Sequence, residues 1–186
     1  MANEIGTETH DAPFFTAATS SACDTGRYCR YSDANFYTKG IGVTSTQGGV
    51  AKPTNSSGSV TIGGEFRITA EGGLPSLGLT LNKVGRTSGW SQGDVTDTCV
   101  DVYTTYYGND LQFKCQYGVQ ATQVGGDSGA PVFRITNSPA TDDVTLYGIA
   151  TATIDGDEFY FSYLGNIFFE LEPSVSWDSC NASFSC

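Results

Sequence analysis

The chain has 186 residues, of which 39% are hydrophobic and 12% aromatic, and this composition predicts a folded core. The formal net charge is −11 with only 9 Lys and Arg side chains, which argues against binding to nucleic-acid phosphates or to anionic membrane surfaces. The sequence contains no run of about 20 apolar residues, so no membrane-spanning helix is predicted.

Alternating apolar and polar residues predict short β-strands along most of the chain. In chain order, the predicted elements are a loop at 46–60, two strands in 59–72 divided by Gly63-Gly64, a strand at 79–84, a hairpin at 95–119 that turns at Gly108-Asn109-Asp110, and a hairpin of 144–154 and 157–164 around Asp155-Gly156. Only 166–172 has a helical pattern. Such short strands predict an all-β fold, either a sandwich or a barrel, with a boundary between two subdomains at 72–78.

Six cysteines fall into three pairs that are close in sequence. Six cysteines can pair in many ways, and proximity favours Cys23–Cys29, Cys99–Cys115 and Cys180–Cys186. The even number predicts disulfides and an oxidising compartment. A zinc site would need an all-cysteine ligand set, because the chain has a single His, and the spacings do not suggest one. No metal and no cofactor are predicted.

A candidate nucleophile lies in GGDSGAPVF, residues 125–133. Ser128 stands between glycines and before an apolar strand, and Gly126 and Gly129 allow backbone conformations that other residues avoid. Such a loop can direct two N–H groups at one point, which is the requirement for an oxyanion hole. The alternative is a glycine-rich turn with an ordinary surface serine. An α/β-hydrolase elbow is a poor match, because it needs GxSxG and position 130 is alanine.

Three segments resemble the chymotrypsin-like serine proteases of microbial type. The nucleophile motif of these proteases resembles GDSGAPVF. The opening strand of their second barrel resembles LNKVGRTSGWSQGDV (81–95), and the segment with their triad aspartate resembles CRYSDANFY (29–37). The resemblance implies two antiparallel six-stranded β-barrels, the first incomplete, and a short C-terminal helix. Residues 1–75 would be the remnant of the N-terminal barrel, and 76–186 the C-terminal barrel with the nucleophile. The implied catalytic residues are Asp33 and Ser128, in the family's order.

The resemblance also implies how the loop around Ser128 is held. The N–H groups of Gly126 and Ser128 would form the oxyanion hole. Asp127 would need a cationic partner, since an unpaired buried carboxylate is costly. Arg86 is the residue that matches this partner, so we expect an ion pair between Arg86 and Asp127 that supports the oxyanion loop.

The substrate pocket implied by the resemblance contains Thr122 and the strand residues Thr151, Ala152 and Thr153. Thr122 matches the position of the pocket floor, and a threonine there does not indicate trypsin-like specificity. Residues 151–153 match the strand that pairs with the substrate backbone. The expected protein is a secreted monomer that acts on peptide or protein substrates.

The single histidine, His10, raises the question of the catalytic base. A serine hydroxyl needs a neighbouring base, and in this family the histidine lies upstream of the aspartate in a segment like TAxHC. His10 lies in GTETHDAPFF, only 23 residues before Asp33, which favours a structural role over a catalytic one. We expect that the catalytic histidine, the first strands of barrel one and any signal peptide precede residue 1. The 186-residue chain itself would then be nearly inactive.

Two other functions stay open at this point. The chain could be a pseudoprotease, which is a binding module of the same fold without a working base. It could also be a structural β-domain with a coincidental GDSG motif, although the joint presence and order of the three segments argue against this. The sequence therefore predicts a serine endopeptidase whose base lies outside these residues, with the pseudoprotease as the alternative.

Overall fold

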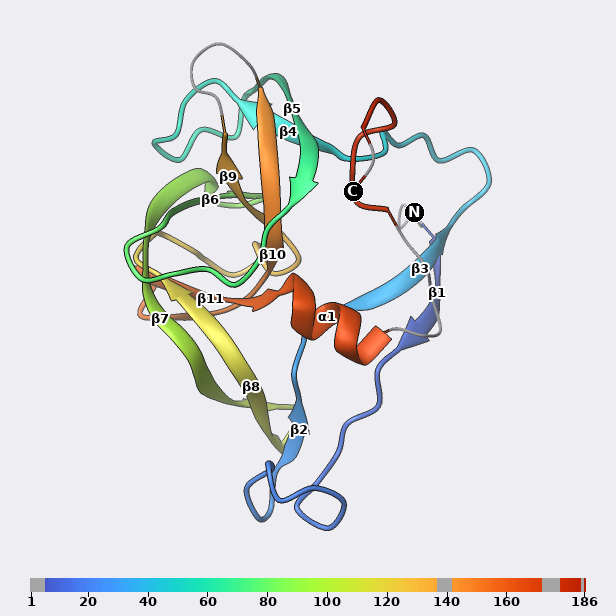
Figure 1. Ribbon diagram of the computed structural model, residues 1–186, viewed down its shortest axis with the longest axis vertical. Helices are drawn as coiled ribbons and strands as arrows, with labels where there is room; N and C mark the ends of the chain where they lie inside the picture. Colours follow the sequence, from blue (N-terminus) through green and yellow to red (C-terminus); the bar gives the residue numbers. More distant parts are fainter. Residues whose placement is uncertain (1–5, 137–141, 172–177, 185) are drawn as a thin grey trace.

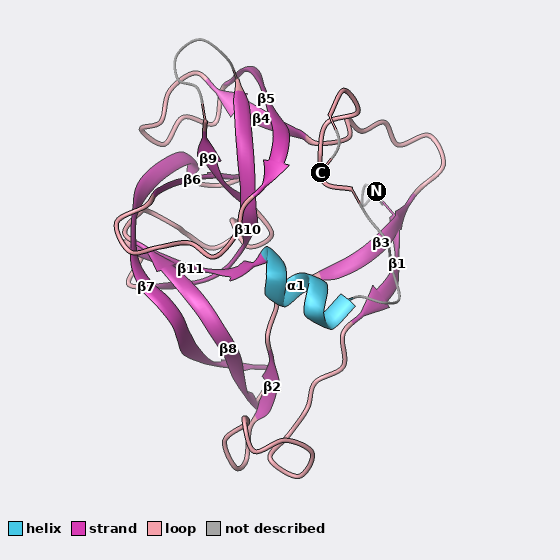
Figure 2. Ribbon diagram, in the orientation of Figure 1, coloured by secondary structure: helices cyan, strands magenta, loops and turns pink. Residues whose placement is uncertain are grey.

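The computed structural model describes residues 6–136, 142–171, 178–184 and 186. Within these ranges the chain is built from strands and one short helix (Figures 1 and 2). The elements are β1 (Gly6–Asp11), β2 (Tyr28–Arg30), β3 (Asn35–Lys39), β4 (Gly49–Pro53), β5 (Ile62–Glu71), β6 (Thr80–Gly85), β7 (Gly89–Tyr106), β8 (Asn109–Val119), β9 (Pro131–Ile135), β10 (Asp143–Ile154), β11 (Glu158–Tyr163) and α1 (Leu164–Leu171). The predicted all-β class is confirmed.

Six strands close into a barrel in the order β11–β8–β7–β6–β9–β10, because β10 also pairs with β11. All pairs in this ring are antiparallel. The strands described before β6 do not close into a second ring, so the first barrel is incomplete. Two pairs outside the ring, β5–β10 and β2–β8, are parallel. The domain division at residue 75 stays a prediction.

Two hairpins of the barrel have tight turns. Tyr107 and Gly108 join β7 to β8 with φ values of 48° and 78°, and a two-residue turn with positive φ matches the twist of the strands. The turn therefore begins one residue earlier than predicted, and Asn109 and Asp110 belong to β8. The chain passes from β10 to β11 through Asp155 and Gly156, also with positive φ, as predicted.

The region from 46 to 72 differs from the prediction. β4 lies inside the segment expected to be a loop, and β5 runs unbroken through Gly63-Gly64. β5 pairs with β4 on one edge and with β10 on the other. The pairing with β4, in which Gly64 lies opposite Lys52, holds this end of β5 in an extended conformation that the glycines' own propensity would not select, so tertiary pairing overrides the local signal.

Two large clusters of buried side chains form most of the core, and a third, smaller one lies on the β7–β8 hairpin. One lies within the barrel and contains Leu81, Val95, Tyr117, Val119, Ala121, Ala130, Val132, Ala150, Phe159 and Phe161. The other includes Phe66, Ile68, Phe133 and Val144 from the strands and Leu164, Ile167 and Leu171 from α1. The buried residues of α1 share one helix face. In the view of Figure 1, α1 lies between the ring and the separate β1–β3 sheet.

Three disulfides join Cys23 to Cys29, Cys99 to Cys115 and Cys180 to Cys186, which confirms the predicted pairing. The Cys99–Cys115 bond crosses the β7–β8 hairpin. The described part of the chain contains no helix with the length and apolar character that a membrane crossing requires.

Candidate active site

Ser128 lies in the loop that leads from β8 into β9. Gly126 and Gly129 have φ values of 99° and 87°, so the loop bends on both sides of the serine in a way that side chains disfavour. The loop is tied to the barrel, because the Gly129 N–H donates to the Ala150 carbonyl at 2.8 Å and the Ala150 N–H donates to the Ala130 carbonyl at 2.9 Å. The nucleophile candidate therefore sits on a loop with a fixed shape.

The backbone N–H groups around Ser128 divide into two sets. Those of Asp127 and Gly129 donate to the carbonyls of Val124 and Ala150. Those of Gly126 and Ser128 form no hydrogen bond with any residue that the structure describes. The latter two are the donors predicted for the oxyanion hole, and they are available to a ligand.

Asp127 is fully buried and accepts four hydrogen bonds from backbone N–H groups and a hydroxyl, besides the one from Lys83 described below. The Thr87 and Ser88 N–H groups donate to Oδ1 at 2.8 and 3.0 Å, the Val124 N–H donates to Oδ2 at 3.2 Å, and the Ser88 hydroxyl also donates to Oδ2. Burial by itself would raise the pKa of Asp127, but these hydrogen bonds outweigh it and hold the pKa well below its usual value. Asp127 is therefore a charged anchor for the loop.

The cation beside Asp127 is Lys83, whose Nζ lies 3.1 Å from Oδ2. Both side chains are inaccessible to solvent, and burial lowers the pKa of Lys83 while Asp127 opposes that shift. The predicted ion pair between Arg86 and Asp127 does not form. Arg86 is exposed in the β6–β7 turn, and its guanidinium lies beside Gly126.

Strand geometry explains this correction. Lys83 and Leu81 are two residues apart in β6, so both point into the barrel. Arg86 follows the end of β6 and does not share that face. The sequence did carry a signal, since a lysine on the apolar face of a predicted strand needs a buried counter-ion.

Asp33 lies between β2 and β3. Its N–H donates to the Ser162 hydroxyl at 3.0 Å, which ties it to β11 of the barrel. Removal from bulk water raises the pKa of Asp33, while the nearby Arg30 lowers it and Asp11 adds to the rise. The carboxylate keeps access to solvent through the cavities described below.

Buried polar side chains hold the backbone directly before Asp33. Glu170 of α1 accepts the N–H groups of Tyr31 and Ser32, and the Ser32 hydroxyl at 2.7 Å. Gln116 of β8 donates to the Tyr31 carbonyl at 2.9 Å and accepts the Ser162 hydroxyl at 3.0 Å. The sequence analysis missed these residues, because isolated polar residues in α1, β8 and β11 form no local pattern.

Asp33 and Ser128 line one cavity of about 630 Å³, which we call the Ser128 cavity. Thr151, Ala152 and Thr153 line it as well, and the Ser128 hydroxyl donates to the Thr151 carbonyl at 3.2 Å. The structure thus brings five of the predicted site residues together.

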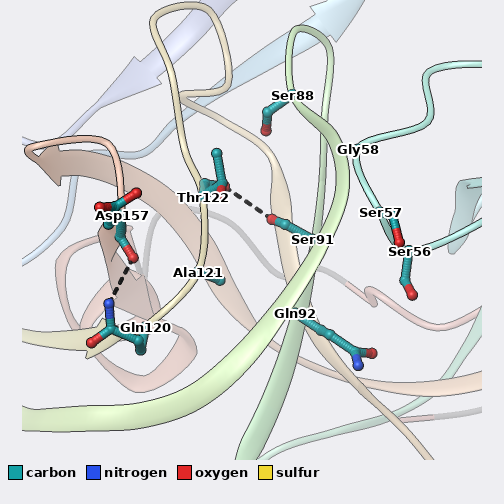
Figure 3. Close-up of a pocket in the computed structure, with 10 residues that line it drawn as sticks. All are labelled: Ser56, Ser57, Gly58, Ser88, Ser91, Gln92, Gln120, Ala121, Thr122 and Asp157. Atoms are coloured by element: carbon teal, nitrogen blue, oxygen red, sulfur yellow. Dashed lines mark hydrogen bonds between the residues drawn. The ribbon is translucent and has the colours of Figure 1, made fainter.

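Thr122 does not line the Ser128 cavity. It lines a separate polar cavity of about 550 Å³, shown in Figure 3, in which the Ser91 hydroxyl donates to the Thr122 carbonyl at 3.0 Å. The next residue, Gln123, lines the Ser128 cavity instead, because successive side chains of an extended segment point in opposite directions. The predicted pocket position is therefore off by one residue.

His10 lies in β1, paired with Phe36 of β3. It lines neither the Ser128 cavity nor a neighbouring cavity of about 400 Å³ that Asp33 shares with Asp11. Since Asp11 faces that cavity, its strand neighbour His10 points to the other face. Elsewhere, the ligand atoms of Asp178, Cys180 and Cys186 lie within 4.8 Å of one another, but both sulfurs are held in a disulfide.

Neither a scan against protein-family models nor a search of curated proteins finds a match. Solved structures do match. A chymotrypsin of Cellulomonas bogoriensis superposes with a TM-score of 0.52 at 19% identity, over 79% of this chain and 69% of that chain. Thermobifida fusca protease A superposes with a TM-score of 0.50 at 21% identity, over 77% of this chain and 65% of that chain. A serine protease specific for glutamic acid superposes with a TM-score of 0.52 at 18% identity, over 85% of this chain and 76% of that chain.

These similarities identify the fold as that of the microbial chymotrypsin-like serine proteases, as the sequence motifs suggested. This chain spans 65–76% of the length of the three solved chains compared above.

Proposed function

We propose that this chain carries the nucleophile, the oxyanion hole and the triad carboxylate of a serine endopeptidase. One observation carries the proposal: Asp33 and Ser128 line the same cavity. The two residues are far apart in the sequence, since Asp33 precedes β3 and Ser128 follows β8. A coincidental GDSG turn would not require an aspartate across the cavity. The fold similarity supports the same assignment.

In this proposal the Ser128 hydroxyl attacks the carbonyl carbon of a peptide bond. The N–H groups of Gly126 and Ser128 bind the oxygen that becomes negative, and Asp127 keeps their loop in shape through Lys83 and Ser88. The amine product leaves and water hydrolyses the acyl-enzyme. The substrate backbone pairs with β10 at Thr151–Thr153, where pairing with β9 has already ended at Ile149.

The proposed base is an imidazole that lies against Asp33 and is not provided by His10. The chain has one histidine, and it does not line the Ser128 cavity. Without a base, a triad enzyme loses several orders of magnitude in rate, so the 186-residue chain alone is expected to be nearly inactive. The three disulfides support an extracellular setting for the substrate, which would be a peptide or protein.

Free imidazole added to the chain tests this proposal. We expect hydrolysis of an activated peptide ester to increase at least about tenfold with imidazole, and the increase to vanish in Ser128→Ala. His10→Ala is the matched control and should respond like the wild type. If imidazole gives no Ser128-dependent rate while the folded chain still binds peptides, the non-catalytic binding module is the better description. A rate abolished by His10→Ala would overturn the assignment of the base.

A further inference from the structure

The Ser128 cavity extends away from the serine along the β7–β8 hairpin. Besides the residues named above, its lining includes Phe14 from the segment after β1, Thr104 and Tyr106 from β7, and Leu111 and Phe113 from β8. We call Phe14, Tyr106, Leu111 and Phe113 the aromatic subsite. The cavity is therefore wider than the nucleophile and its oxyanion hole require.

One face of the hairpin forms most of this wall. Thr104 and Tyr106 are two residues apart in β7, as are Leu111 and Phe113 in β8, and Thr104 pairs directly with Leu111. Alternation therefore puts all four side chains on the same face. Tyr103, which directly precedes Thr104, belongs to the other face, where its hydroxyl donates to Asp24. The pairing register of β7 and β8 therefore brings these four side chains together as one wall of the cavity.

The aromatic subsite has a buried floor and an exposed rim. Leu111 and Phe113 are buried in a small cluster with Val102 and Tyr160. Phe14 and Tyr106 are 43% and 63% exposed. Large rings that stay exposed around a concave apolar surface are typical of binding sites, because a ligand removes their area from water.

The rim rings are held in place by their neighbours. The Arg30 guanidinium lies 5.1 Å from the centroid of the Phe14 ring, and Tyr28 packs edge-on against the same ring at 6.4 Å. Tyr106 packs edge-on against Tyr107 at 4.5 Å. Rings that are already ordered lose little conformational entropy on binding.

The charge of the cavity limits what it can hold. Its lining contains no Lys, Arg or His, and Asp33 is its one acidic residue. An acidic side chain would find no cation there and would meet the field of a chain with a net charge of −11. Burying a Lys or Arg side chain against the apolar rings would cost desolvation, and Asp33, the one carboxylate of the lining, is engaged by the base in the proposed function.

We propose that the aromatic subsite binds a bulky, uncharged apolar side chain of the substrate, and that Tyr106 and Phe14 determine this specificity. This inference rests on the proposed function, since the substrate segment in question is the one paired with Thr151–Thr153. The specificity surface is then the β7–β8 hairpin and not position 122, which lines a different cavity.

The test measures binding by the 186-residue chain, so it needs no catalytic base. The probes are acetylated tetrapeptide amides that differ at a single position carrying Phe, Leu, Ala, Glu or Lys, titrated while backbone amide NMR shifts are followed. We expect the Phe and Leu peptides to bind at least about tenfold more tightly than the other three, with shift changes at Tyr106 and Thr151. Tyr106→Ala and Phe14→Ala should each remove most of this preference.

Tyr103→Ala is the matched control, because Tyr103 lies in the same strand as Tyr106, is 52% exposed, belongs to the other face and does not line the cavity. It should bind the Phe peptide like the wild type. The inference is overturned if the Ala or Glu peptide binds as tightly as the Phe peptide, or if Tyr103→Ala has the same effect as Tyr106→Ala. Imidazole-dependent hydrolysis without any side-chain preference would overturn the subsite alone. A preference without hydrolysis would support the subsite and count against the proposed catalysis.

Discussion

Glu170 of α1 and Ser32 are joined by two hydrogen bonds, from the Ser32 N–H at 2.8 Å and from the Ser32 hydroxyl at 2.7 Å. Ser32 is fully buried and stands next to Asp33 in the sequence. The helix that follows the barrel therefore fixes the backbone that presents Asp33, the carboxylate of the proposed triad. Gln116 and Ser162 hold the same segment from β8 and β11.

Glu170→Gln tests whether this contact positions Asp33. Glutamine has one acceptor oxygen in place of two, so a buried N–H before Asp33 loses its partner, at a cost of about 1–3 kcal/mol. We expect the amide hydrogens of Tyr31 and Ser32 to exchange at least about tenfold faster, while those of β8 stay protected. In the imidazole-dependent reaction, the turnover number should fall while KM stays unchanged.

Ile167→Val is the control in the same helix. It removes one buried methylene at a cost of about 0.5–1.5 kcal/mol and leaves the hydrogen bonds of Glu170 to Tyr31 and Ser32 in place. If both variants change exchange at Tyr31 and Ser32 equally, Glu170 acts only through general stability.

Lys83→Met and Arg86→Met distinguish the observed ion pair from the predicted one. Loss of Lys83 should lower the free energy of unfolding by about 3 kcal/mol, the lower end for a broken buried pair, because Asp127 keeps its other hydrogen bonds. Arg86 is exposed, so its loss should cost less than about 0.5 kcal/mol. Urea denaturation measures both values. The reverse order would restore Arg86 as the partner of Asp127.

Asp127 should give the fold a defined dependence on acid. Its folded-state pKa lies well below the unfolded value of about 3.9, so ionisation stabilises the folded state. This contribution is present in full above about pH 4 and is lost as the pH falls toward the folded-state pKa. The difference in unfolding free energy between wild type and Asp127→Asn should therefore be constant from about pH 7 to 5 and shrink below about pH 4. A difference that stays constant into that acid range would contradict the assignment.

Gly126→Ala and Gly125→Ala form a pair of adjacent substitutions with opposite expectations. Gly126 has a φ of 99°, and a Cβ there would lie 2.6 Å from the Thr87 hydroxyl, so alanine should cost about 1–3 kcal/mol. Gly125 has no such φ and no atom within 4 Å of a Cβ, so alanine should change stability by less than about 1 kcal/mol. Thermal unfolding of both variants measures the strain of the oxyanion loop. Equal losses would mean that the loop relaxes around the new side chain.

The sequence predicted the features that local chemistry determines. The Asp155-Gly156 turn has residues that accept positive φ, and each disulfide joins cysteines that are close in the chain. The motif around Ser128 likewise carries its glycines within a few residues. These signals do not depend on the rest of the fold.

The remaining features depend on contacts between distant segments. β5 includes Gly63 and Gly64 because β4 pairs with that end of it, and no local preference reveals that. Glu170 accepts a hydrogen bond from Tyr31, which lies 139 residues earlier in the chain. No local sequence pattern marks a contact between such distant residues. The choice of Lys83 over Arg86 was decided by which face of β6 points inward.

The most direct test of the account is to locate the adduct of an active-site phosphonate by mass spectrometry. In the presence of imidazole, the account predicts that the 186-residue chain is modified on Ser128, and that Asp33→Asn slows the modification at least about tenfold without unfolding the chain. Modification at another residue, or an equal rate in Asp33→Asn, would contradict the claim that these two residues form one reaction centre.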